Sequence, residues 1–401
     1  MPNFDESIAS DLEALRASGL WRELRTVDSP QGREISIGGE HFLNFSSNDY
    51  LGLANSEGLK EASVKALQDF GSGSGASRLI CGSLKPHSDL EQRLAEFKGT
   101  EAALSYSSGF LASFGSIQAL VGPNDISVID KLVHASIVDG VRLSGAKMRI
   151  FKHNDLNSLS EILWWADRQP KGRVLIITES IFSMDGDRAP LREIVELKEK
   201  HGAWLMVDEA HGTGLYGQHR RGVIEELGLS ERVEVQMGTL GKAIGAAGGY
   251  ICGSRNLIDY LINKARSFIF STAPVPASAA AACAGIDMVR SKDGERRCGR
   301  LWLRVRQLQE EMTGISQTTQ SLSAINPIII GSEQMAVDAS ALLRQNHCFV
   351  PAIRYPTVAR GTARLRLTLS ADHTKNDVQL VAGELRELRR LVGSFKPTIE
   401  K

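Results

Sequence analysis

A single lysine, Lys242, lies in a glycine-rich stretch over residues 238–250 that contains no other charged side chain. Glycines let the backbone approach closely and adopt positive φ, so this stretch is typical of a segment that packs around a ligand. An amine held in such a place loses hydration, its pKa falls, and it becomes a nucleophile for a carbonyl. A lysine in a flexible loop explains the stretch equally well. A phosphate-binding loop does not, because that motif requires glycine at Gln236 and a hydroxyl at Ala243.

Polar side chains that could serve such a site come at the ends of strand-like apolar runs. Residues 173–178, 203–207 and 233–237 are such runs, and strands and helices alternate around them. This order predicts a doubly wound, mostly parallel sheet between helices, in which ligands bind at the carboxyl ends of the strands. The side chains expected there are Ser183, Asp208, His211, Thr239 and Lys242.

Two further segments are candidates for ligand contact. A strand-like run over residues 102–106 is followed by small residues and by a helix that begins near Gly109 and Phe110. Free amides and the helix dipole point at one spot there, although an ordinary capped helix is the more common case. The Gly/Ser run over residues 71–78 is flanked by packed segments and ends in Arg78. We therefore interpret it as a structured loop beside a ligand, in preference to a linker.

Together these groups supply what pyridoxal phosphate requires of a protein. Lys242 can form the Schiff base, Asp208 can keep the pyridinium nitrogen protonated, and His134 can stack on the ring. The donors to phosphate or ring oxygens would be Gly109, Phe110, Ser183 and Thr239, with His211 on the ring hydroxyl. Taken singly the signals are modest, because a lone histidine is more often structural and a strand-terminal aspartate is more often a cap. The H-E-x-x-H and G-x-S-x-G motifs of other enzyme classes are absent.

The composition argues against several functions. Lysine plus arginine and aspartate plus glutamate both total 47, so no net field attracts nucleic acid or anionic lipid. No apolar run reaches the roughly 18–20 residues of a membrane span, and the acidic N-terminus has no signal-peptide pattern. Five scattered cysteines, never in C-x-x-C spacing, are typical of free thiols in a cytoplasmic protein that binds no metal.

Helical and strand patterns divide the chain into three segments. Residues 1–45 would form an N-terminal helix over 4–24 and a strand over 42–45. Residues 46–290 would form the large cofactor-binding domain, with an extended segment over 268–274 near its end. Residues 291–401 would form a smaller C-terminal α+β domain, with the order strand, helix, strand, strand, helix from residue 325. Its last helix starts at a capping-box pattern, Thr374-Lys375-Asn376-Asp377.

The sequence resembles the α-oxoamine synthase family of fold-type-I pyridoxal phosphate enzymes, from about Arg22 to the last helix. The segments that carry the resemblance are residues 44–53, 108–110, 134–136, 182–187, 207–214 and 238–242. Three stretches favour the family members of biotin biosynthesis: residues 44–53, 271–273, and 352–357 with 361–367. The chain also departs from that pattern, because Tyr355 stands where the family usually has the first of two prolines. Val275 separates a second proline pair.

The resemblance implies an acyltransferase that condenses L-alanine with pimeloyl-CoA, or with the pimeloyl carrier protein, and releases carbon dioxide. Lys242 would hold the cofactor and act as the acid–base group at Cα, and His134 would also bind the thioester oxygen. Residues of the family that hold the substrate match Asn48 and Arg354 for the carboxylate, and Arg22 and Thr357 as further contacts. Ser271 and Thr272 would reach the phosphate of a neighbouring subunit, so the resemblance implies a homodimer.

Alternatives remain open at this point. Another family member, such as glycine C-acetyltransferase, would share the lysine and aspartate motifs, and residues 352–357 discriminate against it. An aminotransferase would share the fold and the lysine, but the resemblance is to the condensing branch. A non-catalytic interaction protein would be expected to have lost Lys242 or Asp208, and both are present. The sequence leaves the acyl carrier and the acyl chain length undecided, since Tyr355 lies where the acyl chain would pass.

Overall fold

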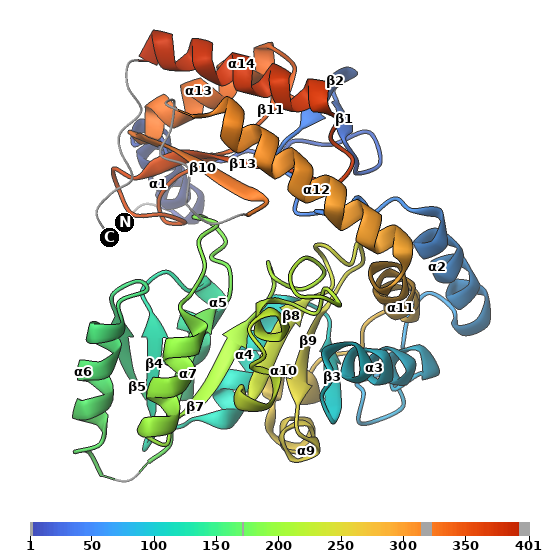
Figure 1. The fold of residues 1–401 in the computed structure, drawn as a ribbon, viewed down its shortest axis with the longest axis vertical. Helices are drawn as coiled ribbons and strands as arrows, with labels where there is room; N and C mark the ends of the chain where they lie inside the picture. The colour runs from blue at the N-terminus through green and yellow to red at the C-terminus, as the bar shows by residue number, and fades with distance from the viewer. Residues whose placement is uncertain (1–2, 171, 314–322, 393–401) are drawn as a thin grey trace. The chain divides into compact units, whose positions relative to one another are not determined.

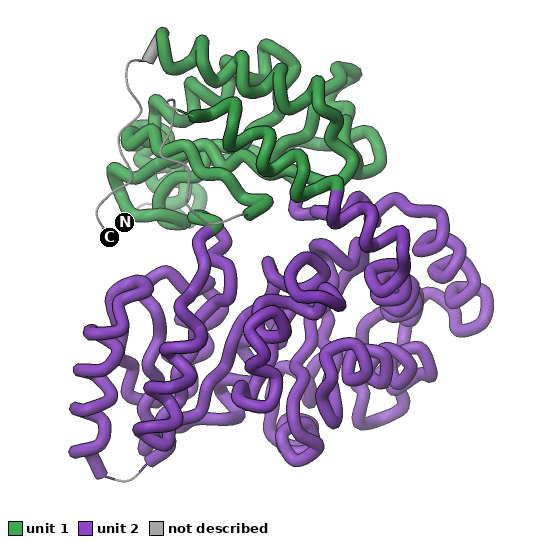
Figure 2. The backbone as a smooth tube through the Cα atoms, in the orientation of Figure 1, with its two compact units in different colours: residues 1–47, 184–186, 300–400 green, residues 48–183, 187–299, 401 purple. Residues whose placement is uncertain are grey.

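The structure, a computed structural model, describes residues 3–170, 172–313 and 323–392. The chain forms two compact units (Figure 2). Unit 1 contains residues 1–47, 184–186 and 300–400, and unit 2 contains residues 48–183, 187–299 and 401. The division at residues 45 and 290 stays a prediction about domains. Among the described residues, no helix combines the length and the apolar character needed to cross a bilayer.

Unit 2 is built on a seven-stranded sheet in the order β3-β9-β8-β7-β6-β4-β5 (Figure 1). Its strands are β3 (Ala102–Tyr106), β4 (Ile126–Asp130), β5 (Lys147–Phe151), β6 (Val174–Glu179), β7 (Trp204–Asp208), β8 (Val235–Thr239) and β9 (Gly249–Gly253). β9 pairs antiparallel with both β3 and β8, and the other pairs are parallel. Apolar runs such as that of β6 are buried on both faces, as in other parallel sheets. The predicted doubly wound, mostly parallel sheet is confirmed.

Helices cover both faces of this sheet. They are α2 (Glu57–Phe70), α3 (Lys85–Lys98), α4 (Gly109–Leu120), α5 (Ala135–Ser144), α6 (Leu156–Ala166), α7 (Leu191–Lys200), α8 (Val223–Glu226), α9 (Arg255–Lys264), α10 (Arg266–Ile269) and α11 (Pro276–Arg290), with a 3-10 turn at Ser230–Arg232. α4 packs on α5, and α6 packs on α7. The chain crosses toward the β5 edge of the sheet through α4 and α5, and it returns through α6 and α7. Because such crossovers are right-handed, the pair α4 and α5 lies on the opposite face of the sheet from the pair α6 and α7.

One expectation for unit 2 is wrong: residues 268–274 are not extended throughout, since α10 occupies Arg266–Ile269. The reason lies in tertiary packing. Phe268 packs edge-on against Tyr106 with ring centroids 5.9 Å apart, and Ser267 Oγ donates to the carbonyl of Leu111 at 2.8 Å. Those contacts require a helical turn there, and short apolar runs do not by themselves distinguish helix from strand.

Unit 1 contains two three-stranded sheets in the orders β1-β2-β11 and β10-β13-β12. Its elements are α1 (Phe4–Ala17), β1 (Glu34–Ile37), β2 (Glu40–Asn44), β10 (Ile325–Gly331), α13 (Glu333–Gln345), β11 (Cys348–Phe349), β12 (Ala352–Ile353), β13 (Ala363–Thr368) and α14 (Lys375–Val392). α12 (Lys292–Glu311) begins in unit 2 and ends in unit 1. The predicted C-terminal order is confirmed, with one additional short strand.

Two predictions about helix ends in unit 1 have opposite outcomes. The capping box of α14 is confirmed, because Thr374 N donates to Asp377 Oδ2 at 2.7 Å and Asp377 N donates to Thr374 Oγ1 at 3.3 Å. The N-terminal helix, expected to reach residue 24, ends at Ala17. Gly19 adopts φ 69°, a conformation that an α-helix does not contain.

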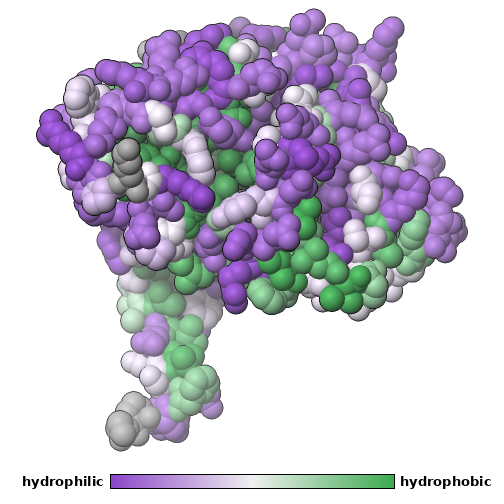
Figure 3. Space-filling view, turned by 90° about the horizontal axis from the view of Figure 1, so that it is seen from below, coloured by the Kyte–Doolittle hydropathy of each residue, from purple (hydrophilic) through white to green (hydrophobic). Residues whose placement is uncertain are grey.

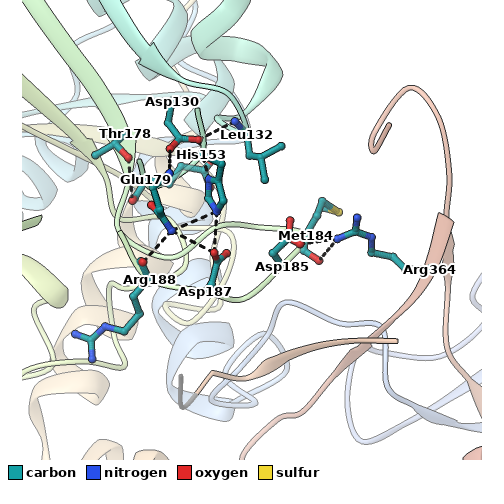
Figure 4. A network of polar contacts seen from close by, with 11 residues as sticks. Asp130, Leu132, His153, Thr178, Glu179, Met184, Asp185, Asp187, Arg188 and Arg364 are labelled. Carbon is teal, nitrogen blue, oxygen red and sulfur yellow. Dashed lines mark hydrogen bonds and ion pairs between the residues drawn. The ribbon is translucent and has the colours of Figure 1, made fainter. Parts of the chain in front are cut away.

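A buried histidine ties together the carboxyl ends of β4, β5 and β6 in unit 2 (Figure 4). His153 follows β5, and its Nδ1 lies 2.9 Å from Asp130 Oδ1 at the end of β4. Its Nε2 lies 2.7 Å from Asp187 Oδ2, beyond β6. Burial alone would lower the pKa of His153, but hydrogen bonds and charge from the two carboxylates raise it to about 9. The protonated ring therefore links the loops that continue into the site.

We expect His153→Gln to remove a pH-dependent part of the stability. The pKa of His153 rises from 6.5 to about 9 on folding, so its stabilisation is complete below pH 6.5 and is lost as pH rises through 9. A shift of this size corresponds to at most about 3 kcal/mol. Urea-unfolding midpoints of the wild-type protein should therefore fall over that pH range, and those of the variant should fall less. Parallel pH curves for the two proteins would contradict this role.

Candidate active site

The Lys242 loop is ordered, and its amine faces a histidine. Lys242 Nζ lies 2.7 Å from His211 Nε2, and both residues belong to unit 2. Backbone hydrogen bonds close the loop, including Leu240 N to Gly248 O at 2.9 Å. Gly245 adopts φ 74°, and a Cβ there would lie 2.6 Å from the Leu53 backbone. The glycines thus allow close packing around the lysine, and the flexible-loop alternative does not describe this segment.

Asp208 and His211 lie at the end of β7, beside the lysine. Asp208 is buried, and its Oδ1 accepts a hydrogen bond from Ala210 N at 2.8 Å. His211 Nδ1 lies 2.5 Å from the hydroxyl of Tyr50, which is also 3.2 Å from Asn48 Oδ1. A continuous chain of polar contacts therefore joins Asn48 and Tyr50 to His211 and Lys242. Sequence reasoning did not identify Tyr50 as part of the site, although it lies in the motif over residues 44–53.

The N-terminus of α4 forms a close-packed cradle near the end of β8. Ser108 is the N-cap, and its Oγ accepts from Leu111 N at 3.2 Å. A Cβ on Gly109 would lie 3.3 Å from Thr239 Cβ, and one on Gly249 would lie 2.5 Å from Gly109 Cα. Gly249 therefore has no room for a side chain, and a side chain at Gly109 would press on Thr239. The first-turn amides of a helix have no intrahelical partner, so this end of α4 can bind an anion next to Thr239.

His134 caps α5 and presents its ring near Phe110. Its Nδ1 lies 2.8 Å from Ser136 Oγ, and the two aromatic rings are almost perpendicular at 6.4 Å between centroids. Partial desolvation lowers the pKa of His134, Lys242 lowers it further, and Asp208 opposes both. Burial raises the pKa of Asp208, whereas Lys242 and His134 lower it. These mutual effects place His134, Asp208 and Lys242 within electrostatic range of one another.

Glu179 is a second buried carboxyl group at this edge, and sequence reasoning missed it. It is the last residue of β6, only 2% exposed, and its register partner on β7 is Asp208. Burial and the charge of Asp208 raise the pKa of Glu179 well above its ordinary value, while backbone hydrogen bonds from His134 and Ser183 oppose the rise. The buried carboxyl group thus lies near the backbone of two predicted cofactor contacts, His134 and Ser183. Glu179 ends an apolar run in the sequence, and that pattern did not indicate a role in the site.

Ser271 and Thr272, the predicted phosphate contacts from a neighbouring subunit, lie beside the loop over residues 71–78. Thr272 forms an isolated antiparallel bridge with Ser77, and Ser74 Oγ donates to Pro274 O at 2.5 Å. Arg78 pairs with Glu91 at 2.8 Å. The interpretation of residues 71–78 as a structured loop is therefore confirmed. The described contacts of Ser271 and Thr272 do not include the Lys242 cluster.

The remaining predicted substrate residues lie in unit 1. Arg354 donates to the carbonyls of Gly19 and Trp21, the latter at 2.9 Å, and Arg22 donates to the Tyr355 carbonyl at 2.9 Å. Burial and the charge of Arg22 lower the pKa of Arg354. Two guanidinium groups thus lie close together within this unit, and Thr357 follows in the same loop.

The residues of unit 2 fit pyridoxal phosphate. The aldehyde of this cofactor requires an amine, and its pyridine nitrogen requires an anion. Its ring requires a flat partner, and its phosphate requires a set of amide donors. Lys242, buried Asp208, His134 and the N-terminus of α4 provide these groups, and His211 provides a partner for the ring hydroxyl. The donor set therefore matches the cofactor group by group.

Comparison with known proteins agrees with this chemistry. The family model described as aminotransferase class I and II matches residues 40–385. The 8-amino-7-oxononanoate synthase of Geobacter sulfurreducens is 45% identical over 390 residues, covering 96% of this chain and 99% of the relative. A second relative of the same name, from Symbiobacterium thermophilum, is 43% identical over 96% of this chain and 98% of its own length.

Solved structures give the same result. Serine palmitoyltransferase from S. paucimobilis with a bound PLP–myriocin aldimine has a TM-score of 0.90 and 29% identity, covering 97% of this chain and 98% of that chain. An 8-amino-7-oxononanoate synthase from Francisella tularensis has a TM-score of 0.75 and 28% identity, covering 87% and 98%. The chain therefore belongs to the aminotransferase class I and II family and, within it, to the α-oxoamine synthases, whose fold-type-I architecture its sequence predicted.

Proposed function

We propose that this protein is a pyridoxal-phosphate-dependent acyltransferase that condenses L-alanine with a pimeloyl thioester of CoA or of a carrier protein. The products are 8-amino-7-oxononanoate, carbon dioxide and the free thiol carrier, a reaction of biotin biosynthesis. The observation that carries the proposal is the amine of Lys242 against His211, beside buried Asp208. Similarity to synthases of this name along nearly the whole chain supports the choice of substrates.

Within this proposal, the side chains of unit 2 handle the protons. Bound pyridoxal phosphate supplies an electron sink for the charge that develops at the amino acid Cα. Lys242 would hold the cofactor and, once free, would move the proton at Cα of the amino acid. Asp208 would pair with the pyridine nitrogen and keep it protonated; burial raises the pKa of this carboxyl group, and the charge of Lys242 opposes the rise. His134 would cover the ring and donate to the thioester oxygen, while Ser183 and Thr239 would donate to oxygens of the cofactor.

Four residues are the candidates for substrate recognition. Asn48, which is tied to His211 through Tyr50, and Arg354 would bind the carboxylate of alanine. Arg22 and Thr357 would contact the acyl donor. The proximity of Arg22 and Arg354 supports an anionic ligand, because two guanidinium groups repel unless an anion lies between or beside them.

A homodimer would complete the site, with Ser271 and Thr272 reaching the phosphate in the neighbouring subunit. Exposed apolar side chains near these residues support such an interface, notably Ile80 at 78% and Phe270 at 71% exposure. Figure 3 shows apolar side chains gathered in patches on the face that it presents. All five cysteines are free thiols, as predicted, which supports a cytoplasmic location.

The assignment is tested by product mass spectrometry. Alanine, glycine and serine are each paired with acetyl-, succinyl-, pimeloyl- and palmitoyl-CoA. The expected result is 8-amino-7-oxononanoate from alanine and pimeloyl-CoA, with little product from the other pairs. An equal or higher kcat/KM with glycine and acetyl-CoA would replace this function by that of glycine C-acetyltransferase.

Lys242→Ala should abolish covalent attachment of the cofactor. No other lysine should replace it, because the ordered loop places this amine against His211. Borohydride reduction followed by peptide mass spectrometry should find the adduct on Lys242 in the wild-type protein and in the control Lys60→Ala, whose lysine is paired with Glu57 on the surface. An adduct on any other lysine would overturn the proposed function.

Asp208→Asn should keep the shape of the site but remove the charge that holds the pyridine nitrogen protonated. One such electrostatic contact contributes several kcal/mol, so kcat should fall on the order of 10²-fold or more. Turnover is measured at saturating cofactor, with Asp167→Asn elsewhere in unit 2 as the control. A variant with near-native turnover would show that Asp208 is only the cap of a strand end.

Arg354→Lys should raise the KM for alanine about tenfold, since lysine replaces a bidentate partner with a point charge. Visible absorbance of the bound cofactor should not change, because Arg354 is proposed to contact the substrate carboxylate and not the cofactor. The control is Arg344→Lys on α13. If the KM for alanine stayed the same while that for the acyl donor rose, Arg354 would belong to the acyl site.

A further inference from the structure

A groove of about 710 Å³ lies at the amino edge of the unit 2 sheet, and nothing above assigns it a role. It is formed where β3, β6, β7 and β8 begin and where the antiparallel β9 ends, and the first turns of α9 contribute to its wall. Asp208, by contrast, ends β7 at the carboxyl edge. The groove is therefore separate from the candidate active site, and its volume is that of a small-molecule site.

The order of the strands sets the order of the side chains along this groove. Glu101 precedes β3 at one end, Trp204 opens β7, and Arg173 precedes β6 at the other end. The strand order β3-β9-β8-β7-β6 places four strand intervals between Glu101 and Arg173. Because neighbouring strands lie about 4.8 Å apart, the two backbones are separated by about 19 Å along the edge. The groove thus has an acidic end and a basic end.

The half of the groove that β3, β9 and β8 form carries two carboxylates without a cationic partner. Glu101 Oε2 accepts from the backbone amide of Arg255 at 2.8 Å, and Glu231 is exposed in the 3-10 turn before β8. Among the described residues neither carboxylate forms an ion pair, whereas Glu234 of the same groove is paired with Lys198 at 2.5 Å. Uncompensated charge of one sign in a groove attracts a ligand of the opposite sign.

Arg173 is held in position at the other end. Its guanidinium carbon lies 5.1 Å from the centroid of the Trp204 ring, and its Nη1 donates to the carbonyl of Leu120 at 2.9 Å. Asp125 accepts from the backbone amide of Arg173, and within the described parts of the chain no carboxylate pairs with this guanidinium. Its other N–H groups are therefore able to donate to an anion.

The wall between the charged ends is largely apolar. It is formed by Leu120, Trp204, Val233, Val235, Leu257 and Tyr260. Tyr260 is 36% exposed and Trp204 is half-buried, so both rings are accessible to a ligand. A hydrocarbon chain that covers such a wall removes apolar surface from water, which favours binding.

We infer that this groove binds a small amphipathic zwitterion, an amino acid whose ammonium group and carboxylate are separated by an apolar chain. The ammonium group pairs with Glu101 and Glu231, the chain lies along Trp204 and Tyr260, and the carboxylate accepts from Arg173. Phosphorylated ligands fit less well, because two carboxylates would repel them. The inference does not depend on the proposed function, since the groove and the Lys242 cluster use different residues.

Calorimetry with the intact, cofactor-loaded protein tests the inference with 8-aminooctanoate as the probe. Octylamine and octanoate keep the chain but lack one charged group, so each should bind about three- to tenfold more weakly. The shorter 4-aminobutyrate cannot reach both ends and should bind more weakly still. Visible absorbance of the cofactor should not change during the titration, because the groove contains no contact to it.

Variants at the two ends should have opposite selectivity. Arg173→Gln should weaken binding of 8-aminooctanoate and octanoate but leave octylamine unchanged. Glu231→Gln should weaken binding of 8-aminooctanoate and octylamine but leave octanoate unchanged. The matched controls are Arg192→Gln and Glu193→Gln, because both residues are exposed on α7 in the same unit.

The apolar wall is tested by Trp204→Leu, which should weaken binding of all three eight-carbon probes. If this variant does not fold, Tyr260→Ala at the exposed rim should give the same loss. Equal affinity of the wild-type protein for these three probes, or no binding of 8-aminooctanoate at millimolar concentration, would overturn the inference.

Three further outcomes assign the ligand or the groove differently. Binding that changes the cofactor absorbance and is insensitive to Arg173→Gln would place the probe at Lys242 and overturn the inference. A change of oligomeric state in the groove variants, without any binding of the probe, would overturn it in favour of a protein interface. Failure to form 8-amino-7-oxononanoate would refute the proposed function and leave the binding results in support of the groove.

Discussion

The amine of Lys242 and the buried carboxyl groups of Asp208 and Glu179 lie at the carboxyl edge of the unit 2 sheet. The candidate site depends on which of these groups is charged. Glu179 and Asp208 are register partners on neighbouring strands, so two adjacent negative charges in a low-dielectric environment would repel strongly. Burial raises the pKa of both carboxyl groups and Lys242 opposes the rise in each, while the charge of Asp208 adds to the rise at Glu179, whose pKa lies well above its ordinary value. Because the pKa of Glu179 is raised further, Asp208 is the carboxyl group of this pair that ionises first. Asp208 is therefore the better candidate partner for a protonated ring nitrogen.

A second buried charge fixes the chain just after Asp208. Glu209 is fully buried, pairs with Lys98 at 2.6 Å, and accepts from Ile224 N at 3.1 Å. Gly222 packs against it so closely that a Cβ would lie 2.1 Å from Glu209 Oε2. Removal of either partner from such a pair leaves an uncompensated buried charge, which is strongly destabilising. Asp208 is thus positioned by Glu209, the next residue in the sequence. Lys98, at the end of α3, neutralises the charge of Glu209.

Local patterns in the sequence were sufficient for the parallel sheet, for most helices, and for Lys242 and Asp208 as a pair. Alternating apolar runs specify strands, and parallel strands bring their carboxyl ends to one edge, so residues far apart in sequence meet there. Tyr50 and Glu179 could not be found this way, because their roles come from partners on other elements. The helical turn at residues 266–269 was missed for the same reason, since the contacts of Phe268 and Ser267 decide it.

The candidate cofactor residues and most candidate substrate residues belong to different units. Every contact described for the cofactor lies within unit 2, where strand ends and the N-terminus of α4 hold the groups through the backbone of the sheet. Arg22, Arg354 and Tyr355 lie in unit 1, on a nine-residue loop and on the segment after α1. Loops tolerate substitution far better than buried strand ends do. A change of acyl preference is therefore expected to arise in unit 1, as Tyr355 illustrates, while the proton-handling residues of unit 2 stay the same.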